Sequence, residues 1–326
     1  MHGIRKYIIL LFVGSAAFAA LFAYLGYRAF HEPSATTTKS AFLVPSGQGL
    51  IRTARLLNQA ELITDPEIFK VGVMLKGSER NLKAGEFLIP ANSSMNDIMN
   101  ILVKGDVIQH KITIVEGWTS WQIAEYLNAV ENLTDVIEEL PIEGSILPES
   151  YLYTHATSRF DILMRMQEQQ MEVLDQLWDK RAEDLPFDTV EEALILASIV
   201  ERETGVPEER PHIAGVFVNR LRRSIRLQSD PTIIYGIDRK GFLDRGLRRS
   251  EIADKDNPYN TYQINKLPPT AIAHPGRASI EAVLNPIETD DIYFVADGIG
   301  GHAFAKTLNE HQKNVAKWRK IEASNK

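Results

Sequence analysis

The segment that most constrains the fold is residues 189–201, which read as one helix that is apolar on nearly every side. Thr189 is followed three residues later by Glu192, the capping-box pattern that marks a helix start. Residues 193–200 are then apolar except for Ser198. A helix with apolar side chains all round has to be buried. We therefore expect the rest of the chain to pack around this helix.

Glu201 follows the apolar run directly, on the last turn of the predicted helix. A carboxylate at this place is partly removed from water, and desolvation disfavours its charged form. We therefore expect a group that holds its proton near neutral pH, as a general acid must. The alternative is a solvated glutamate at a helix end, because Arg202, Glu203 and Thr204 could mark an exit to water.

Two further elements follow this helix. Pro207 and Pro211 favour the first turn of a second helix, whose C-terminal end carries several arginines. After a short extended piece, Asp230 and Pro231 predict an N-cap and a first helical residue, and this helix stops at Gly236. Asp230 is therefore either a helix cap or a site residue.

Several motifs in this region and beyond it resemble the endolytic murein transglycosylase (YceG-like) family. In chain order they are ASIVERET (197–204), VFVNRL (216–221), LQSDPTIIYG (227–236), YNTY (259–262), LPP (267–269), HPG (274–276), YFVA (293–296) and GHAF (301–304). Separate motifs in the family's order are far more specific than one short pattern. The departures are modest: Glu149 and Ser150 replace the family's usual Asp-Thr, and Gln312 replaces its usual asparagine.

The resemblance implies an enzyme, a lytic transglycosylase that cuts glycan strands of peptidoglycan internally. It would cleave the β-1,4 bond between N-acetylmuramic acid (MurNAc) and N-acetylglucosamine (GlcNAc), leave 1,6-anhydroMurNAc ends, and so terminate the growth of nascent strands. The resemblance carries the catalytic glutamate onto Glu201. Motif membership also makes candidate glycan-binding residues of Gln228, Asp230, Tyr235, Asn260 and Tyr262.

Two other functions stay open at this point. Ordinary glycosidases use two carboxylates, one as acid and one as base or nucleophile. Asp230 is the nearest partner for Glu201 within the motifs, so a hydrolytic muramidase on the same scaffold is the first alternative. A peptidoglycan-binding scaffold without enzymatic activity is the second.

Other chemistries lack their sequence signatures. The chain has no cysteine, which excludes thiol nucleophiles, disulfides and iron–sulfur clusters. It has no zinc-protease, serine-hydrolase or phosphate-binding-loop motif, and its histidines lack a compact ligand spacing. We therefore expect neither a cofactor nor a metal. A net charge of −7 argues against a nucleic-acid partner, which requires a basic surface.

The N-terminal segment predicts a membrane anchor. Arg5 and Lys6 precede a run without charges from Tyr7 to Tyr27, which is long enough to cross a bilayer as a helix. The positive tail (1–6) favours the cytoplasmic side, so we expect a single-pass protein of the bacterial inner membrane with its catalytic domain outside the cytoplasm. A cleaved signal peptide is the alternative, with its site at 17–19. Peptidoglycan synthases are candidate protein partners.

The remaining chain divides into a linker and two domains of an α+β protein. Residues 28–40 are rich in proline, serine and threonine and predict the linker. In residues 41–108, a strand–helix–helix–strand order looks like a small LysM-type fold, a glycan-binding module, or else a spacer. The resemblance implies that residues 109–326 form the larger, YceG-like catalytic domain. In it, we expect a long helix at 161–182, strands at 292–295 and 302–304, and a last helix at 308–318.

Overall fold

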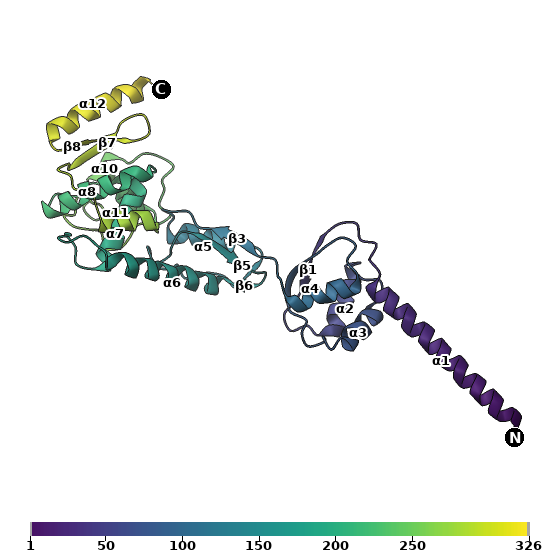
Figure 1. The fold of residues 1–326 in the computed structure, drawn as a ribbon. Coiled ribbons are helices and arrows are strands. Elements are labelled where there is room, and N and C mark those ends of the chain that lie inside the picture. The colour runs from purple at the N-terminus through teal and green to yellow at the C-terminus, as the bar shows by residue number, and fades with distance from the viewer. Residues whose placement is uncertain (1, 325–326) are drawn as a thin grey trace. The chain divides into compact units, whose positions relative to one another are not determined.

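The structure, a computed structural model, describes residues 2–324 (Figure 1). The chain forms two compact units. Unit 1 comprises the residues up to His110 together with 153–155, and unit 2 comprises 111–152 and the residues after 155. Helices and short sheets are mixed in the chain, in agreement with the predicted α+β class.

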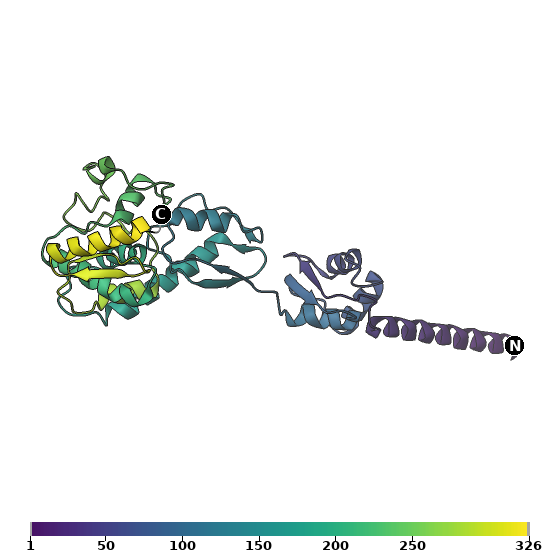
Figure 2. The same ribbon diagram turned by 90° about the horizontal axis from the view of Figure 1, so that it is seen from above.

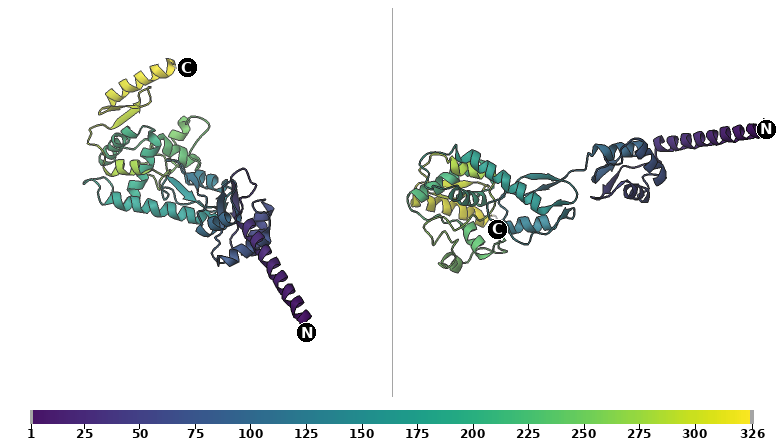
Figure 3. Two further views of the ribbon diagram at one scale, coloured as in Figure 1. Left: turned by 45° about the vertical axis from the view of Figure 1, so that its right-hand side comes forward. Right: turned by 90° about the horizontal axis from the view of Figure 1, so that it is seen from below.

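The first helix, α1 (His2–His31), runs without interruption for 30 residues (Figure 3). Its segment 5–31 is long and apolar enough to cross a membrane. Near its C-terminal end, however, Phe30 is only 4% exposed, and its ring lies 6.5 Å from the ring of Phe69 in unit 1. The predicted linker 28–40 is therefore helical up to His31. Arg28 lies within the helix and pairs with Glu32, one turn later, at 3.3 Å.

Unit 1 has the strand–helix–helix–strand order expected from the sequence, followed by one more helix. Its elements are β1 (Ser40–Val44), α2 (Leu50–Gln59), α3 (Pro66–Leu75), β2 (Gly85–Ile89) and α4 (Met95–Lys104). The two strands are antiparallel, with Phe42 opposite Phe87, and both rings point into the core. Asp65 caps α3 by accepting two backbone N–H groups, and Pro66 suits the first helical position.

Unit 2 begins with two small sheets and the longest helix of this unit. Strand β3 (His110–Thr113) pairs with β5 (Ser150–Tyr153), and β4 (Leu133–Thr134) pairs in parallel with β6 (Thr157–Ser158). Helix α5 (Ser120–Asn128) lies between β3 and β4 in sequence, and α6 (Arg159–Trp178) follows β6. Arg159 is buried and donates to the carbonyls of Leu127 and Leu133, which joins α6 to the end of α5.

The core of unit 2 surrounds α7 (Val190–Glu203), as its sequence predicts. The helix begins with the expected capping box, in which Thr189 and Glu192 each bond the other's backbone. Leu196, Ile199 and Val200 are completely buried, and α7 packs against α8 (Arg210–Arg222), α9 (Asp230–Ile237) and α11 (Arg277–Leu284). The short elements η1 (Pro207–Glu209) and α10 (Arg249–Ile252) complete this part. Each buried leucine or isoleucine stabilises the fold by about 1.5–3 kcal/mol.

The C-terminal part is a hairpin covered by a helix. Strands β7 (Tyr293–Ala296) and β8 (His302–Ala305) are antiparallel, and α12 (Leu308–Ser324) lies along them (Figure 2). These three elements confirm the sequence prediction for this segment. Two side chains of α8 hold the segment that leads into the hairpin. Arg220 donates to the carbonyl of Ile292 at 2.6 Å, and Asn219 donates to the carbonyl of Thr289 at 2.7 Å.

Candidate active site

Glu201 lies at the end of α7 with only 4% of its side chain exposed. Arg210 donates from Nη2 to Oε1 of Glu201 at 3.0 Å, and the backbone N–H of Gly276 donates to Oε2 at 2.9 Å. Burial disfavours the charged carboxylate, whereas both donors favour it. The predicted burial is confirmed, and the alternative of a solvated glutamate is wrong. Neither donor follows from the apolar run before Glu201, from which desolvation alone was expected.

Arg210 connects Glu201 to a second carboxylate. The same Nη2 atom donates to Oε2 of Glu116 at 2.8 Å. The Arg210 side chain is 10% exposed, and that of Glu116 is 41% exposed. Two carboxylates therefore share one guanidinium and have a formal charge of −1 together with it. This cluster can accept one proton and still keep one ion pair.

A pocket of about 350 Å³ opens over this cluster. That volume lies at the low end of the range for small-molecule sites. The lining combines the end of α7, the start of α8 and the segment after β3, and consists of Val115, Glu116, Gly117, Glu201, Arg202, Glu203, Thr204, Gly205 and Arg210. Glu201 is thus a buried acid with access to a cavity, the arrangement that proton transfer to a bound molecule requires.

The segment 271–276 is held against α7 by two hydrogen bonds. The N–H of Ile272 donates to Oγ of Ser198 at 3.0 Å, and the N–H of Gly276 donates to Glu201. Ser198 and Glu201 are three residues apart, so they lie on one face of the helix. A side chain at position 276 would meet Oε1 of Glu116 at 1.9 Å. Glycine therefore allows the backbone to approach both carboxylates.

His274 fixes the conformation of this segment from inside. Its side chain is completely buried, and burial lowers its pKa to about 3, so the ring is neutral. The N–H of Ile146 donates to Nδ1 at 3.1 Å, which places the ring proton on Nε2, where it is donated to Oγ of Ser120 at 2.9 Å. Among residues 5–324, whose side chains the structure describes, no group of three or more His, Asp or Glu is arranged to hold a metal ion.

The polar residues after Glu201 do not form an exit to water. Arg202 donates to the carbonyls of Gly117 and Gly241 at 3.1 and 2.7 Å, and Thr204 is only 6% exposed. Glu203 is partly buried and lines the pocket. Burial raises the pKa of Glu203 to about 7, and the negative charge of Asp230 adds to this effect. Sequence reasoning missed Glu203, although its place two residues after Glu201 was a usable signal.

The raised pKa of Glu203 predicts how stability depends on pH. A carboxyl with a pKa of 4.5 when unfolded and about 7 when folded stabilises the fold fully below pH 4.5, and this stabilisation is lost as the pH rises through 7. We expect Glu203→Gln to remove a pH-dependent part of about 1–2 kcal/mol from the free energy of unfolding. Thermal unfolding between pH 5 and 8 measures it.

As the pH rises from 5 to 8, the free energy of unfolding should therefore fall less for Glu203→Gln than for the parent protein. The free energy of unfolding of the variant should still depend on pH, because burial also raises the pKa of Glu143 to about 7. Identical pH slopes for the parent and Glu203→Gln would contradict the prediction.

Three of the predicted glycan-binding residues form one polar group, in which Gln228 and Asp230 are exposed and Tyr262 is half-buried. The hydroxyl of Tyr262 donates to Oδ1 of Asp230 at 2.7 Å, and both Asp230 and Gln228 are exposed. Gln228 accepts a hydrogen bond from Arg220 at 3.3 Å. The alternative of Asp230 as a helix cap is wrong. Ser229 occupies the cap position, so the helix begins one residue earlier than the sequence suggested.

The other two predicted glycan-binding residues are used inside the protein. Asn260 is completely buried; its amide donates to the carbonyls of Glu251, Ile252 and Asp254, and thereby closes a loop. Tyr235 is 5% exposed, belongs to the core, and packs with its ring centroid 5.1 Å from that of Tyr259. We therefore propose no glycan contact for either side chain.

Comparison with known proteins now places the chain among its relatives. A sequence model of the YceG-like family matches residues 42–317. The chain belongs to this family. The match confirms the resemblance inferred from the motifs, and it includes Glu201 and the whole of the pocket.

Two named proteins and one solved structure are similar to this chain. The protein named endolytic murein transglycosylase in Bacillus subtilis (strain 168) is 29% identical, over 91% of this chain and 90% of its own length. A protein of the same name in Streptococcus pneumoniae serotype 2 (strain D39 / NCTC 7466) is 28% identical, over 84% of this chain and 57% of its own length. The crystal structure of a putative YceG-like protein from Listeria monocytogenes is 26% identical, with a TM-score of 0.52, and covers 84% of this chain and 98% of its own.

Proposed function

We propose that this protein is a lytic transglycosylase that cleaves the MurNAc–GlcNAc β-1,4 bond within peptidoglycan glycan strands. The observation that carries the proposal is the Glu201 carboxyl, which is 4% exposed and reaches a pocket of about 350 Å³. Family membership and the relatives named endolytic murein transglycosylase support the substrate class.

In the first step, Glu201 acts as the general acid. The pocket cluster can take up one proton while Arg210 keeps its ion pair with Glu116. We assign the acid to Glu201, the more buried of the two carboxylates and the one at the motif position of the family's catalytic glutamate. The proton passes to the glycosidic oxygen, the bond from C1 of MurNAc to that oxygen breaks, and the GlcNAc hydroxyl leaves. The 2-acetamido group of the substrate stabilises the developing positive charge at C1.

In the second step, the same carboxylate acts as the base. It takes the proton from the C6 hydroxyl of MurNAc, whose oxygen attacks C1 and closes the 1,6-anhydro ring. The proton that Glu201 gave to the glycosidic oxygen is thus replaced by the one from the C6 hydroxyl, and no water is consumed. Because the nucleophile belongs to the substrate, its proximity can lower the barrier by several kcal/mol. One carboxylate is therefore sufficient, and Arg210 and Gly276 hold it in place when it is ionised.

The polar group of Gln228, Asp230 and Tyr262 is our candidate for binding the glycan. Hydroxyl, amide and carboxylate groups at the surface suit the many hydroxyls of a sugar. Asp230 lies near enough to Glu203 for its charge to raise the pKa of that pocket residue, so this group is electrostatically coupled to the pocket. The hydrogen bond from Tyr262 orients Asp230 before a substrate arrives.

We further propose that α1 anchors the protein in the bacterial inner membrane as a single span. Its apolar segment supports a crossing, and Arg5 and Lys6 support a cytoplasmic N-terminus. The catalytic unit then lies outside the cytoplasm, where it would end nascent strands beside peptidoglycan synthases. The strand–helix–helix–strand arrangement of β1, α2, α3 and β2 supports a LysM-like module in unit 1.

The products of peptidoglycan digestion test the proposed reaction. Purified peptidoglycan is incubated with the full-length protein in detergent, and the soluble fragments are analysed by mass spectrometry. We expect fragments with 1,6-anhydroMurNAc ends, which are lighter by one water than hydrolytic fragments. Reducing ends alone would show a hydrolytic muramidase, the alternative in which Asp230 is the candidate second carboxylate. Tight binding to peptidoglycan without any new ends would show a non-enzymatic scaffold.

A further inference from the structure

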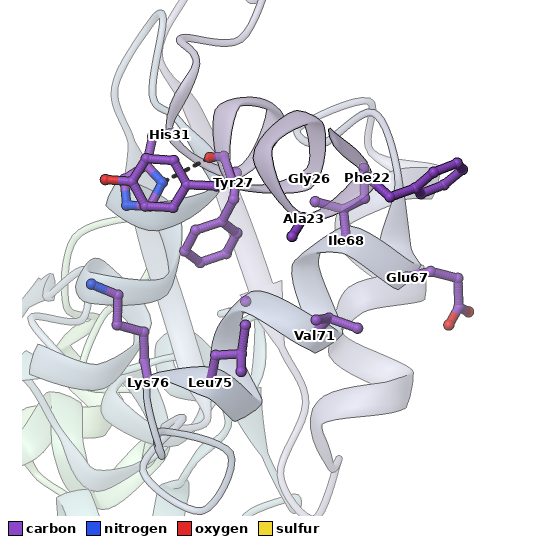
Figure 4. Close-up of a pocket in the computed structure, with 12 residues that line it drawn as sticks. Phe22, Ala23, Gly26, Tyr27, His31, Glu67, Ile68, Val71, Leu75 and Lys76 are labelled. Carbon is purple, nitrogen blue, oxygen red and sulfur yellow. Dashed lines mark hydrogen bonds between the residues drawn. The ribbon is translucent and has the colours of Figure 1, made fainter. Parts of the chain in front are cut away.

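A groove in unit 1 separates the end of α1 from one face of α3 (Figure 4). Its volume is about 510 Å³, and most of its lining is apolar. Helix α1 contributes Phe22, Ala23, Gly26, Tyr27, Phe30 and His31, and α3 with the residue after it contributes Glu67, Ile68, Val71, Gly72, Leu75 and Lys76.

Helix α3 is apolar on two opposite sides, although only one of them packs on the core. Phe69 and Val73 are completely buried in unit 1. Val71, Met74 and Leu75 are instead 54%, 61% and 83% exposed. A surface helix of a soluble protein normally presents polar side chains on its outer face. Apart from Glu67 at its start, which pairs with Lys70 at 2.6 Å, the outer face of α3 has the apolar side chains of a helix that lies in a membrane interface.

The position of α3 along α1 is fixed by close packing. The ring of Phe30 occupies the space above Gly72, so closely that a side-chain carbon added there would lie 2.3 Å from it. The uncharged run Tyr7–Tyr27 is about 30 Å long as a helix, which equals the hydrocarbon thickness of a bilayer. The groove is lined by the end of this run, so the outer face of α3 lies at the depth where the span leaves the hydrocarbon.

We propose that the outer face of α3 is embedded in the membrane interface, with phospholipid acyl chains filling the groove between α1 and α3. This proposal rests on the membrane anchoring proposed above. Val71 and Leu75 contact the acyl chains, and the Lys76 ammonium at the end of the groove reaches the level of the phosphates. Lipid is the favoured occupant because the groove is continuous with the membrane span. The contact would fix the orientation of unit 1 on the bilayer.

The absence of cysteine from the chain allows a direct test with single labelled positions. Leu75→Cys and Val71→Cys in the full-length protein are labelled with a polarity-sensitive fluorophore and reconstituted in phosphatidylethanolamine–phosphatidylglycerol vesicles. Lipids carrying a nitroxide near the head-group end of the acyl chain serve as quenchers. Phe22→Cys reports on the span itself. Leu88→Cys, an exposed leucine of the same unit outside the groove, is the matched control.

We expect a blue shift and quenching at positions 71 and 75 comparable with those at position 22, and neither effect at position 88. Unquenched labels at both 71 and 75, beside a quenched label at 22, would overturn the proposal and leave the anchor intact. An unquenched label at 22 would overturn the membrane span, and the groove proposal with it. Quenching of the labels at 71 and 75 that persists at a low protein-to-lipid ratio supports lipid as the occupant. A blue shift without quenching that disappears on dilution with lipid shows that a second copy of the protein fills the groove, and overturns the proposal.

Discussion

The Glu201→Gln variant is expected to lose cleavage of peptidoglycan by a factor of at least about 10³, because glutamine can neither donate the proton to the glycosidic oxygen nor take one from the C6 hydroxyl. The substitution keeps the size and shape of the side chain. Its amide can still accept one of the hydrogen bonds from Arg210 and Gly276, so we expect the free energy of unfolding to fall by only about 1 kcal/mol. Release of anhydro ends and thermal unfolding measure the two effects separately.

Two matched variants on the same helix make this result specific. Glu191→Gln changes an exposed glutamate in the first turn of α7 and should leave the activity unchanged. Glu203→Gln changes a further carboxylate of the pocket, whose raised pKa makes it the competing candidate for the acid. Full activity of Glu201→Gln together with an inactive Glu203→Gln would move the catalytic role to Glu203. A folded Glu201→Gln variant with full activity contradicts the proposed mechanism in any case.

The Arg210→Ala variant is expected to lower the free energy of unfolding by about 3 kcal/mol, the cost of leaving a buried charge without its partner. Glu201 is 4% exposed, and Arg210 is the cation that pairs with it at 3.0 Å. Glu116 also loses this partner, but at 41% exposure it can turn to water. Most of the loss should therefore come from Glu201. Thermal and chemical unfolding of the full-length protein in detergent measure the change.

A double-mutant cycle assigns the loss to this pair. In the Glu201→Gln background, the same Arg210→Ala change should cost less by about 2 kcal/mol, because a neutral amide needs no counter-charge. Arg223→Ala is the control. It changes an exposed arginine directly after α8, the helix that begins with Arg210, and should change the free energy of unfolding by less than about 0.5 kcal/mol. Equal costs of Arg210→Ala in both backgrounds would show that Arg210 contributes packing rather than charge.

The local elements of this protein follow from the sequence because their causes lie within a few residues. The capping box of Thr189 and Glu192 starts α7 where predicted, and the apolar run after it is buried. The C-terminal hairpin and the last helix also appear where the pattern of apolar residues places them. Element boundaries depend on single residues: Ser229 rather than Asp230 caps α9, and the helix α1 continues to His31 although the linker was predicted from residue 28.

The sequence by itself determined that a glutamate ends a buried helix, that motifs of one family surround it, and that an apolar segment precedes them. Only the tertiary structure decided what that glutamate touches. Glu116 and Gly276 lie 85 and 75 residues from Glu201 along the chain, and no local period connects such positions. The same is true of Asn260, which shares a motif with Tyr262 yet is buried by its own loop. Helix propensity and periodicity act over a few residues, whereas charge pairing and desolvation depend on which distant segments the fold brings together.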